Sequence, residues 1–449
     1  MMKKIFTIAT IFLAISLASC QKDAFTYSLF KPDTVDSIYF STGSTKLIAD
    51  GRARLDFVIE TFRKLQITTK NGTIKDSMVF VDYNELPSGS LKIFDDSGNQ
   101  VGLTYSTNNP APGTVSFYAQ VGNTKSATKM VTLRTKPDEY PKMTIDVIFH
   151  NFDQSKTDKF YDPYVYQPVT IKQLEIAIKD LNDVFNNRLG YDSNGGSANV
   201  EFRLATTDPS GKVLVVPGLD NIVYDNSIKQ NQAAGFYSVP DFQIYVNKNA
   251  STLIWDPQKY LNIYVIPSGA NNSMYSYRPF YQFVPPGKTY LPGITRSVAT
   301  ANIGAVAPAT NPALPSATNG VVTSPFVIPK YWETVGCIVP NTLFFPGSNR
   351  RVSISPQVGV FFSVMATQGN TTYNDYCTDT RIYNNSDAKK NSWTTLIKTG
   401  INGEKFMANN AMDDIRYPSL RNTFTVDQVY RIRWVLSNCP GRNCGVLVP

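Results

Sequence analysis

The sequence predicts a multidomain chain in which a β-sandwich precedes an α/β domain. Residues 37–134 consist of short runs of alternating apolar and polar residues separated by turn residues, a pattern typical of a sandwich. Residues 143–266 instead alternate strands with a long amphipathic helix, as in an α/β layer. The segment Lys136-Pro-Asp-Glu-Tyr-Pro141 lies between them, and each proline disfavours regular structure around it.

The N-terminus has the composition of a secreted precursor. Met1 to Lys4 is basic, and Ile5 to Leu17 is apolar but too short to span a bilayer stably. The following Leu17-Ala-Ser-Cys20 resembles a bacterial lipobox, which implies that residues 1–19 are a lipoprotein signal peptide and that the Cys20 thiol carries the lipid. An ordinary signal peptide or an uncleaved anchor are the alternatives. We therefore expect an outer-membrane lipoprotein on the surface or periplasmic face of the cell envelope.

Residues 20–36 are polar and mixed, and we interpret them as a tether. The predicted sandwich covers residues 37–135. In Ala53–Ile59 and in Val115–Val121, alternate apolar residues share one face of a strand. Further strands are expected at 78–83, 91–94, 101–105 and 130–133. Ala49-Asp-Gly-Arg-Ala-Arg-Leu55 resembles the opening of invasin-type bacterial immunoglobulin-like modules, which are spacers more often than binders.

The second domain is expected over residues 140–449. A strand at Met143–Phe149 precedes an amphipathic helix at Val169–Leu189, with Thr170 as its N-cap and Gly190 at its end. Strands follow at 200–205 and 260–266, and a final helix is expected at 425–436. Residues 267–329 are rich in Pro, Ala, Ser, Thr and Tyr, and we expect them to form surface loops around a groove.

Histidine content restricts the chemistry. The chain has 449 residues and a single histidine, His150, so a zinc centre built on two or three imidazoles cannot be assembled from one copy. His150 stands at the end of a core strand, which favours a structural role over a ligand role. No P-loop or Gly-x-Ser-x-Gly motif is present. The formal charge is +8 but the basic residues are scattered, so nucleic-acid binding is not expected.

Four cysteines remain after Cys20, and an oxidising compartment favours disulfides. Four cysteines allow three pairings. The short spacing of the last two favours a local loop, which would pair the first two. The candidates are Cys337, Cys377, Cys439 and Cys444.

The second domain contains six segments that carry a family resemblance. In chain order they are 180–182, 200–211, 255–264, Asp375-Tyr-Cys-Thr-Asp-Thr380, Asn410-Ala-Met-Asp413 and 424–436. In this order they resemble metzincin-type zinc metalloproteases of the pappalysin and cytophagalysin family, especially Bacteroidetes lipoproteins, over about residues 140 to 440. The segment 375–380 is similar to the family's Asp-Thr-Pro segment with Arg381 in place of proline, and the segment 410–413 resembles its methionine turn.

The family's catalytic element is His-Glu-x-Gly-His-x-x-Gly-x-x-His, in which two ligands lie on consecutive helical turns and a third follows a bend. Tyr331–Phe345 is the stretch that we expect to correspond to it. One register places Glu333, Cys337 and Leu343 at the ligand positions and Thr334 at the general base. The other keeps Glu333 as the base and places Trp332, Gly336 and Thr342 at the ligand positions. Neither register supplies three ligands with a base.

The resemblance therefore implies a pseudoenzyme with no cofactor, in which Met412 remains although the zinc motif is degenerate. Its expected role is binding of peptide, protein or glycan, and such lipoproteins commonly accompany outer-membrane nutrient importers. The alternative is an active zinc metallopeptidase with an atypical site around Glu333, Asp379 and Asp413. A third hypothesis is a purely structural envelope or adhesion protein.

Overall fold

The computed structural model describes residues 31–157, 168–190, 192–224, 248–267, 336–344, 351–369 and 375–438, with isolated residues and short pieces between these ranges. The predicted signal peptide and Cys20 lie outside the described residues, as do Glu333, Thr334 and Cys439. The chain divides into two compact units. Unit 1 comprises Met1–Tyr39, Glu60–Lys92 and Ala119–Ala127, and unit 2 comprises Phe40–Ile59, Ile93–Tyr118 and Thr128–Pro449.

Residues 37–134 form two main sheets, as the alternating pattern predicts. One has the strand order β1 (Ser37–Ser41), β4 (Val58–Thr68), β5 (Ile74–Val81). The other has the order β2 (Lys46–Ile48), β11 (Lys129–Arg134), β9 (Thr114–Val121), β6 (Leu91–Asp95), β7 (Gln100–Val101), with β10 (Thr124–Lys125) paired to β9. Strands β3 (Leu55–Asp56) and β8 (Thr104–Tyr105) pair separately.

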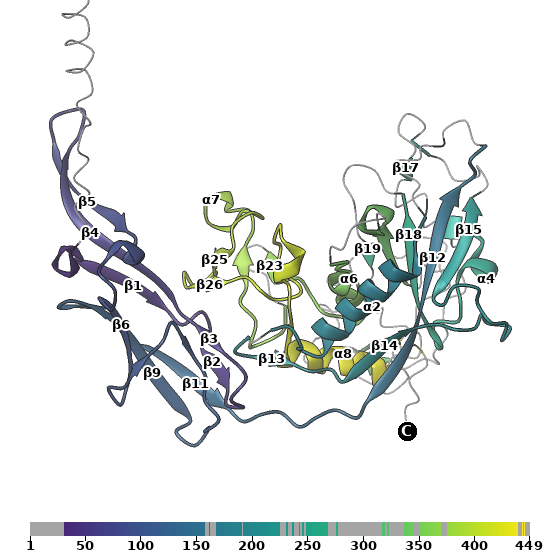
Figure 1. The fold of residues 1–449 in the computed structure, drawn as a ribbon, viewed down its shortest axis with the longest axis horizontal. Helices are drawn as coiled ribbons and strands as arrows, with labels where there is room; N and C mark the ends of the chain where they lie inside the picture. The colour runs from purple at the N-terminus through teal and green to yellow at the C-terminus, as the bar shows by residue number, and fades with distance from the viewer. Residues whose placement is uncertain are drawn as a thin grey trace, which may run out of the picture. The chain divides into compact units, whose positions relative to one another are not determined.

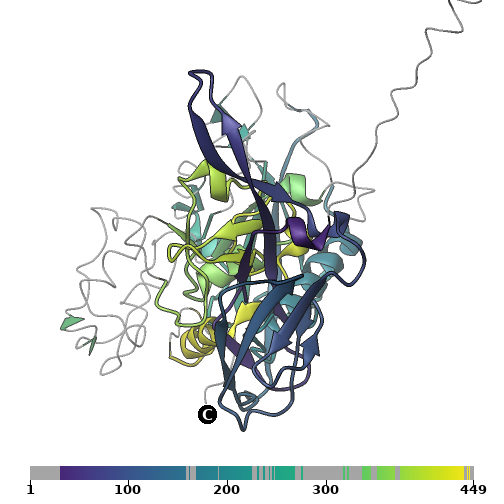
Figure 2. The same ribbon diagram turned by 90° about the vertical axis from the view of Figure 1, so that its left-hand side faces the viewer.

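Aromatic side chains connect the two sheets within unit 2. The ring of Phe57 lies 5.3 Å from that of Phe40 on β1 and 5.1 Å from that of Phe117 on β9, measured between centroids. The predicted strand at Ala53–Ile59 is interrupted at Phe57, whose side chain fills the space between the sheets. An immunoglobulin-like class for this region stays a prediction. In unit 1, β4 and β5 form a long antiparallel hairpin (Figure 2).

The second half of the chain is built on a mixed sheet. Its strand order is β14 (Val200–Leu204), β12 (Met143–Gln154), β18 (Tyr260–Ile266), β22 (Gly336–Pro340), β19 (Tyr275–Ser276). All neighbours are parallel except β19, which runs antiparallel to β22. The second part of β12 pairs with β15 (Leu219–Tyr224) (Figure 1).

The long amphipathic helix is confirmed as α2 (Ile171–Phe185). Thr170 precedes it, and its backbone N–H donates to the side-chain carbonyl of Gln173 at 2.8 Å, which satisfies a donor at the helix start. The helix ends before Leu189 because Asn186 is its C-cap and Asn187 has φ of 50°. The side-chain amide of Asn186 donates to the carbonyl of Val200 at 2.8 Å, which connects the helix end to β14.

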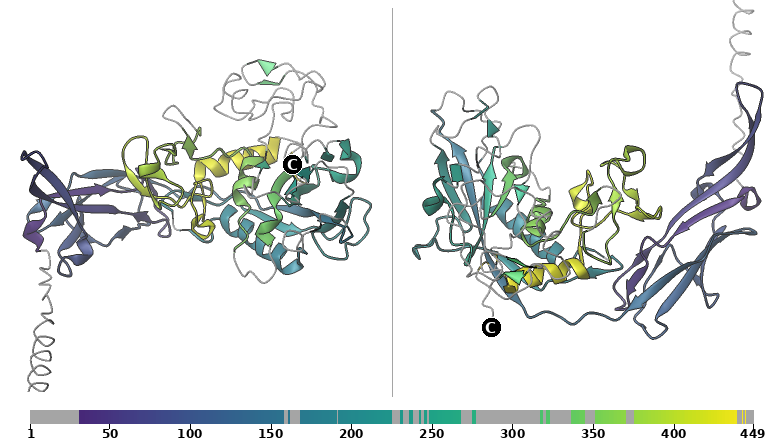
Figure 3. Two further views of the ribbon diagram at one scale, coloured as in Figure 1. Left: turned by 90° about the horizontal axis from the view of Figure 1, so that it is seen from above. Right: turned by 180° about the vertical axis from the view of Figure 1, so that it is seen from behind.

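The two faces of the sheet are covered differently. Side chains at odd positions of β12, such as Val147 and Phe149, join a core with α2, α6 (Ser355–Phe361) and α8 (Val426–Asn438). These three helices lie on one side of the sheet (Figure 3). Side chains at even positions face the other way, where Ile148 packs with Trp255 and Phe152 packs beside α4 (Ala250–Leu253).

The remaining described elements are short. They are η1 (Pro32–Thr34), η2 (Tyr83–Glu85), β13 (Gly195–Gly196), β16 (Gln230–Asn231), β17 (Phe236–Tyr237), β20 (Ala317–Thr318), β21 (Val321–Val322), η4 (Asn341–Phe344), β23 (Gln368–Gly369), β24 (Tyr383–Asn384), α7 (Ala388–Asn391), β25 (Ile397–Thr399), β26 (Lys405–Met407), η5 (Pro418–Leu420) and β27 (Phe424–Thr425). Among the helices that the structure describes, none is long and apolar enough to cross a bilayer.

Candidate functional site

Of the stretch Tyr331–Phe345 that the sequence aligns with the zinc motif, the structure describes residues 336–344, and these do not form the helix that the motif requires. Residues Gly336–Pro340 are the strand β22, which lies between β18 and β19 in the sheet. All five residues are buried, so Cys337 belongs to the core of the helix-covered face. Leu343 lies in the short helix η4 and packs against the same core. An apolar, β-branched run bounded by glycine and proline is typical of a buried strand.

The next helix that the structure describes after β22 and η4 is α6, which has Gly359 at the position of one motif glycine and Ser363 at the position of the other. A methyl group added at Gly359 would come within 2.9 Å of the Phe424 ring and 3.2 Å of the Met412 sulfur, so a larger residue would have to displace these side chains. Four residues later Ser363 has φ of 76°, the left-handed conformation that favours glycine. The N–H groups of Val364 and Ser363 donate to the carbonyls of Gly359 and Val360, both at 2.9 Å, which is a Schellman helix end.

Setting Gly359 and Ser363 on the two glycines of the motif gives a register that the sequence alone did not suggest. It places Pro356, Val360 and Ala366 at the three ligand positions and Gln357 at the general-base position. All four side chains are partly exposed, whereas Val358, Gly359, Phe361 and Phe362 between them are buried. Proline, valine and alanine have no side-chain donor atom, and an amide cannot act as a general base, so these residues do not fit a catalytic zinc ion.

The predicted methionine turn lies directly under α6, as the Gly359 contact with Met412 shows. The side chain of Asn410 accepts from the Met412 N–H at 2.9 Å, and the Asp413 carboxylate accepts from the Asn410 N–H at 2.9 Å. Thr367 donates its hydroxyl to the same carboxylate at 2.5 Å. Burial raises the pKa of Asp413. The carboxylate therefore closes the turn.

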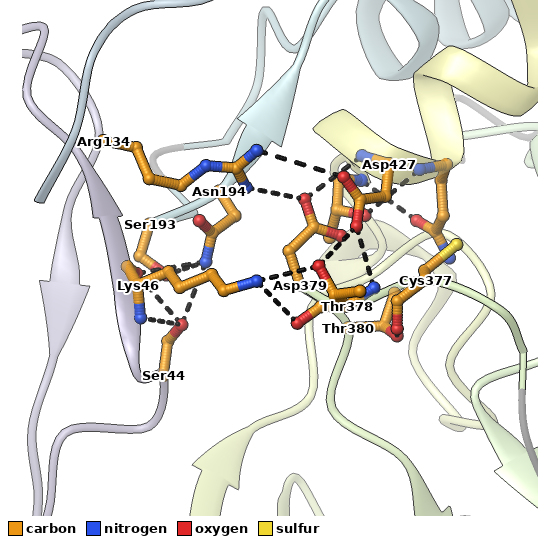
Figure 4. Close-up of polar contacts among 12 residues, drawn as sticks. Ser44, Lys46, Arg134, Ser193, Asn194, Cys377, Thr378, Asp379, Thr380 and Asp427 are labelled. Carbon is orange, nitrogen blue, oxygen red and sulfur yellow. Dashed lines mark hydrogen bonds and ion pairs between the residues drawn. The ribbon is translucent and has the colours of Figure 1, made fainter. Parts of the chain in front are cut away.

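Asp379 is likewise held in a structural contact. Its carboxylate accepts from the Arg134 guanidinium at 3.2 Å and from the backbone N–H of Asp427, in the first turn of α8, at 3.1 Å (Figure 4). Burial, and secondly the nearby Asp427 charge, raise the pKa of Asp379. Lys46 donates to the Thr378 carbonyl at 3.0 Å and to its hydroxyl at 2.8 Å. Within unit 2, these contacts join the segment 378–379 to β2, to β11 and to α8.

Asp375, in the segment that resembles the family's Asp-Thr-Pro motif, is fully buried without an ion pair in the described structure. One carboxylate oxygen accepts from the Cys377 N–H at 3.1 Å, and the other has no hydrogen-bond partner among the described groups. Burial raises the pKa of this carboxyl to about 6, opposed by hydrogen bonds and by the charge of Arg431. Burial of the Asp375 carboxyl therefore disfavours its charged form.

His150 lies on the opposite face of the sheet and is fully buried. Its Nε2 lies 2.9 Å from the Asn262 side-chain oxygen, and its Nδ1 lies 2.8 Å from a carboxylate oxygen of Asp220. Asn262 exchanges two hydrogen bonds with the Trp255 backbone, which fixes its oxygen toward His150. His150 Nε2 must then donate, and a proton must also lie between Nδ1 and Asp220. Both ring nitrogens are therefore engaged by protein groups. The imidazole also stacks on the Tyr264 ring, with the two ring centroids 5.0 Å apart.

The structure does not contain the predicted disulfide between Cys337 and Cys377. Cys444 is not part of a disulfide bond either. Cys337 points into the apolar core of the sheet, and Cys377 belongs to the segment shown in Figure 4. Burial raises the pKa of the Cys377 and Cys444 thiols, so neither is a reactive thiolate at neutral pH. Cys439 lies outside the described residues.

No group of three His, Cys, Asp or Glu side chains within the described part of the chain is arranged to hold a metal ion. A cavity of about 550 Å³ does lie within unit 2 beside the segment of Figure 4. Its wall combines hydroxyl groups from 41–46 and 378–380 with the Lys129–Glu404 ion pair and with apolar side chains, among them Ile401. The volume lies in the range of small-ligand sites.

Neither the family models nor the curated proteins include a match to this chain. Among solved structures it is similar to mature mirolysin of Tannerella forsythia in complex with a cleaved peptide, with 17% identity, a TM-score of 0.43, and coverage of 68% of this chain and 97% of that one. Mirolysin in complex with compound 9 has 17% identity, a TM-score of 0.44, and coverage of 69% and 97%. A Tannerella forsythia promirolysin mutant gives 17%, 0.43, and coverage of 68% and 84%. These likenesses are distant and assign no activity to this chain.

Proposed function

We propose that this chain is a lipid-anchored envelope protein whose second domain is a catalytically inactive relative of metzincin metalloproteases. The observation that carries the proposal is the helix α6. It keeps the packing position of Gly359 over Met412 and the left-handed bend at Ser363, while Pro356, Val360 and Ala366 stand at the ligand positions. Gln357 in place of the catalytic glutamate removes the base as well.

The proposed role of the domain is binding of an extended peptide, a protein segment or a glycan. Two features support this role. Strand β19 lies beside α6 and is the last strand of the sheet within the described residues, where no further strand pairs with its outer edge, and such an edge suits an extended chain. The cavity of about 550 Å³ has hydroxyl and charged groups that suit a polar ligand. With a lipid on Cys20, such a protein would serve as an accessory to an outer-membrane importer.

The test of inactivity uses the mature chain from Gln21 to Pro449. We expect less than a tenth of an equivalent of zinc by elemental analysis after dialysis, and no cleavage of casein above a blank. Stoichiometric zinc together with casein cleavage that is lost in Glu333→Ala would establish the rival, an active peptidase with an atypical site.

The test of binding measures the affinity of casein-derived peptides and of immobilised glycans for the same chain. Ile401 is half exposed at the cavity wall, and Ile401→Arg should lower the affinity at least tenfold if the ligand occupies the cavity. Val215→Arg, at a fully exposed position away from the cavity lining, is the matched control. If only the sandwich, residues 37–135, is needed for envelope function in cells, the structural or adhesion role is correct instead.

A further inference from the structure

The hairpin β4–β5 in unit 1 exposes several large apolar side chains, and their exposure to water is unfavourable. In the described sheet β5 is an edge strand, and all of its residues except Ser77 and Val81 are exposed. The exposed fractions are 65% for Ile74, 50% for Met78 and 55% for Phe80. Contiguous exposed apolar side chains of this size mark interaction surfaces.

These three side chains share one face of the hairpin because they alternate along β5. The register places Phe80 opposite Phe62 and Met78 opposite Lys64 on β4, so Phe62 belongs to the same face. The Phe62 and Phe80 rings lie 6.1 Å apart. We call this set, Phe62, Ile74, Met78 and Phe80, the ribbon face.

The charge of the hairpin is predominantly positive. Residues 62–81 contain four basic side chains, Arg63, Lys64, Lys70 and Lys75, and one acidic side chain, Asp76. Asp76 is paired with Lys64 at 2.8 Å on the ribbon face, so the other three cations carry the net charge. A strip of apolar residues flanked by cations suits the interface of a bilayer that contains anionic lipids.

The chain between the lipid site and the hairpin is short. The N–H of Lys64, at the base of the ribbon, donates to the Asp36 carboxylate at 2.7 Å. Asp36 lies sixteen positions after Cys20, and even a fully extended chain of that length reaches only about 55 Å. An acyl group on Cys20 would therefore hold the ribbon at high effective concentration near the lipid, where a weak contact suffices.

We propose that the ribbon face of β4–β5 is a membrane-contacting surface that lies on the lipid to which Cys20 is attached. This inference rests on the lipid anchor of the proposed function. The occupant of the surface is an anionic phospholipid interface, which takes the apolar side chains into the headgroup region while the net positive charge of the hairpin, from Arg63, Lys70 and Lys75, attracts it to the lipid phosphates.

The experiment uses the unlipidated chain from Gln21 to Pro449 with vesicles of phosphatidylethanolamine and phosphatidylglycerol at 3:1. We expect it to sediment with these vesicles, and the triple variant Ile74→Ser, Met78→Ser, Phe80→Ser to bind at least tenfold more weakly. The matched control is Val213→Ser with Val215→Ser, two valines exposed to 73% and 98% in unit 2, which should bind as the parent does. Lys70→Glu with Lys75→Glu should weaken binding, and so should neutral phosphatidylcholine vesicles.

Circular dichroism of each variant separates loss of binding from loss of fold, because the substituted side chains are exposed. Vesicle binding that is absent in the parent, or equal in the triple variant, overturns the proposal. If the triple variant instead abolishes self-association or capture of a protein without any vesicle binding, the ribbon face is a protein interface and the lipid assignment is wrong. Mass spectrometry of the Cys20 peptide from cells tests the anchor separately, so failure of the anchor and failure of the surface give different results.

Discussion

The two faces of the central sheet differ in which potential metal-ligand residues they carry. On the helix-covered face, Gly359 of α6 packs near Met412 and a left-handed bend follows at Ser363, and in our proposed register the ligand positions hold Pro356, Val360 and Ala366. On the opposite face, His150 is buried with both ring nitrogens engaged by Asp220 and Asn262. In our proposed register, α6 therefore has the packing of a metal-binding helix without side chains that bind a metal, and the only histidine lies on the other face of the sheet.

The comparison also shows why one histidine is no remnant of a zinc site. Val147 and Phe149 point toward the helices, and His150, the next residue along β12, points away from them. No rotation of its side chain brings it to α6 through the sheet. Its hydrogen bonds stabilise the sheet instead.

The largest effect is expected from placing histidines at the three ligand positions of our proposed register. In the variant Pro356→His, Val360→His, Ala366→His, two imidazoles lie one turn apart on α6 and the third follows the Ser363 bend. We expect one equivalent of zinc with a Kd below about 1 μM, which corresponds to a favourable binding free energy greater than about 8 kcal/mol. Isothermal titration and elemental analysis measure it.

Ala366→His alone is the matched control for that variant, because a single imidazole should retain no zinc after dialysis. A zinc-dependent rise in Tm should accompany binding in the triple variant only. A triple variant that is folded but takes up no zinc would show that our register for α6 is wrong, and with it the inference of lost catalysis.

The next largest effect is expected on the other face. His150→Ala leaves the Asp220 carboxylate and the Asn262 oxygen without their partner and opens a cavity beside Tyr264. We expect a loss of about 3–5 kcal/mol in the free energy of unfolding. Val360→Ala, at a partly exposed position on α6, should cost under about 1 kcal/mol by the same urea titration. Equal costs for the two variants would contradict the assignment of the histidine to structure.

The sequence predicted the elements with strong periodicity and failed at those set by tertiary packing. β18 has the predicted bounds, and α2 and α8 were predicted to within a few residues, because apolar spacing determines which face packs. The zinc motif was aligned with Tyr331–Phe345, whose described residues 336–340 form a buried strand, because one glycine and a short apolar run do not distinguish a strand from a helix. Ser363 adopts a glycine-like φ that no sequence pattern shows, and only the Met412 contact identifies Gly359.

A smaller effect is expected from Asp375 on the helix-covered side. Its pKa of about 6 in the folded state exceeds the ordinary value of 3.8, so the folded protein binds the proton more tightly and stability falls as pH rises from about 4 to 7. Asp375→Asn keeps an acceptor for the Cys377 N–H and should remove about 1–3 kcal/mol of that fall. Urea titrations of both proteins at pH 4, 5.5 and 7 measure the difference. Asp180, whose pKa is also raised to about 6 by burial, is unchanged in the variant and cancels. Parallel pH profiles would mean that Asp375 is already neutralised by a partner.

The smallest effect concerns the bend itself. Ser363 holds a left-handed conformation that costs a non-glycine residue about 1–2 kcal/mol, whereas glycine adopts it freely but gains entropy when unfolded. Ser363→Gly should therefore stabilise the protein by about 0.5–1 kcal/mol in a urea titration. The substitution also removes a buried hydroxyl that has no hydrogen-bond partner among the described groups, and this loss could itself stabilise the protein.

Ser363→Ala is the matched control, since it removes the hydroxyl, keeps the Cβ and should not relieve the strain of the left-handed backbone. If alanine stabilises as much as glycine, the gain comes from the buried hydroxyl. The bend would then be no inherited glycine position, and the likeness of α6 to a metal-binding helix would rest on Gly359 and Met412 alone.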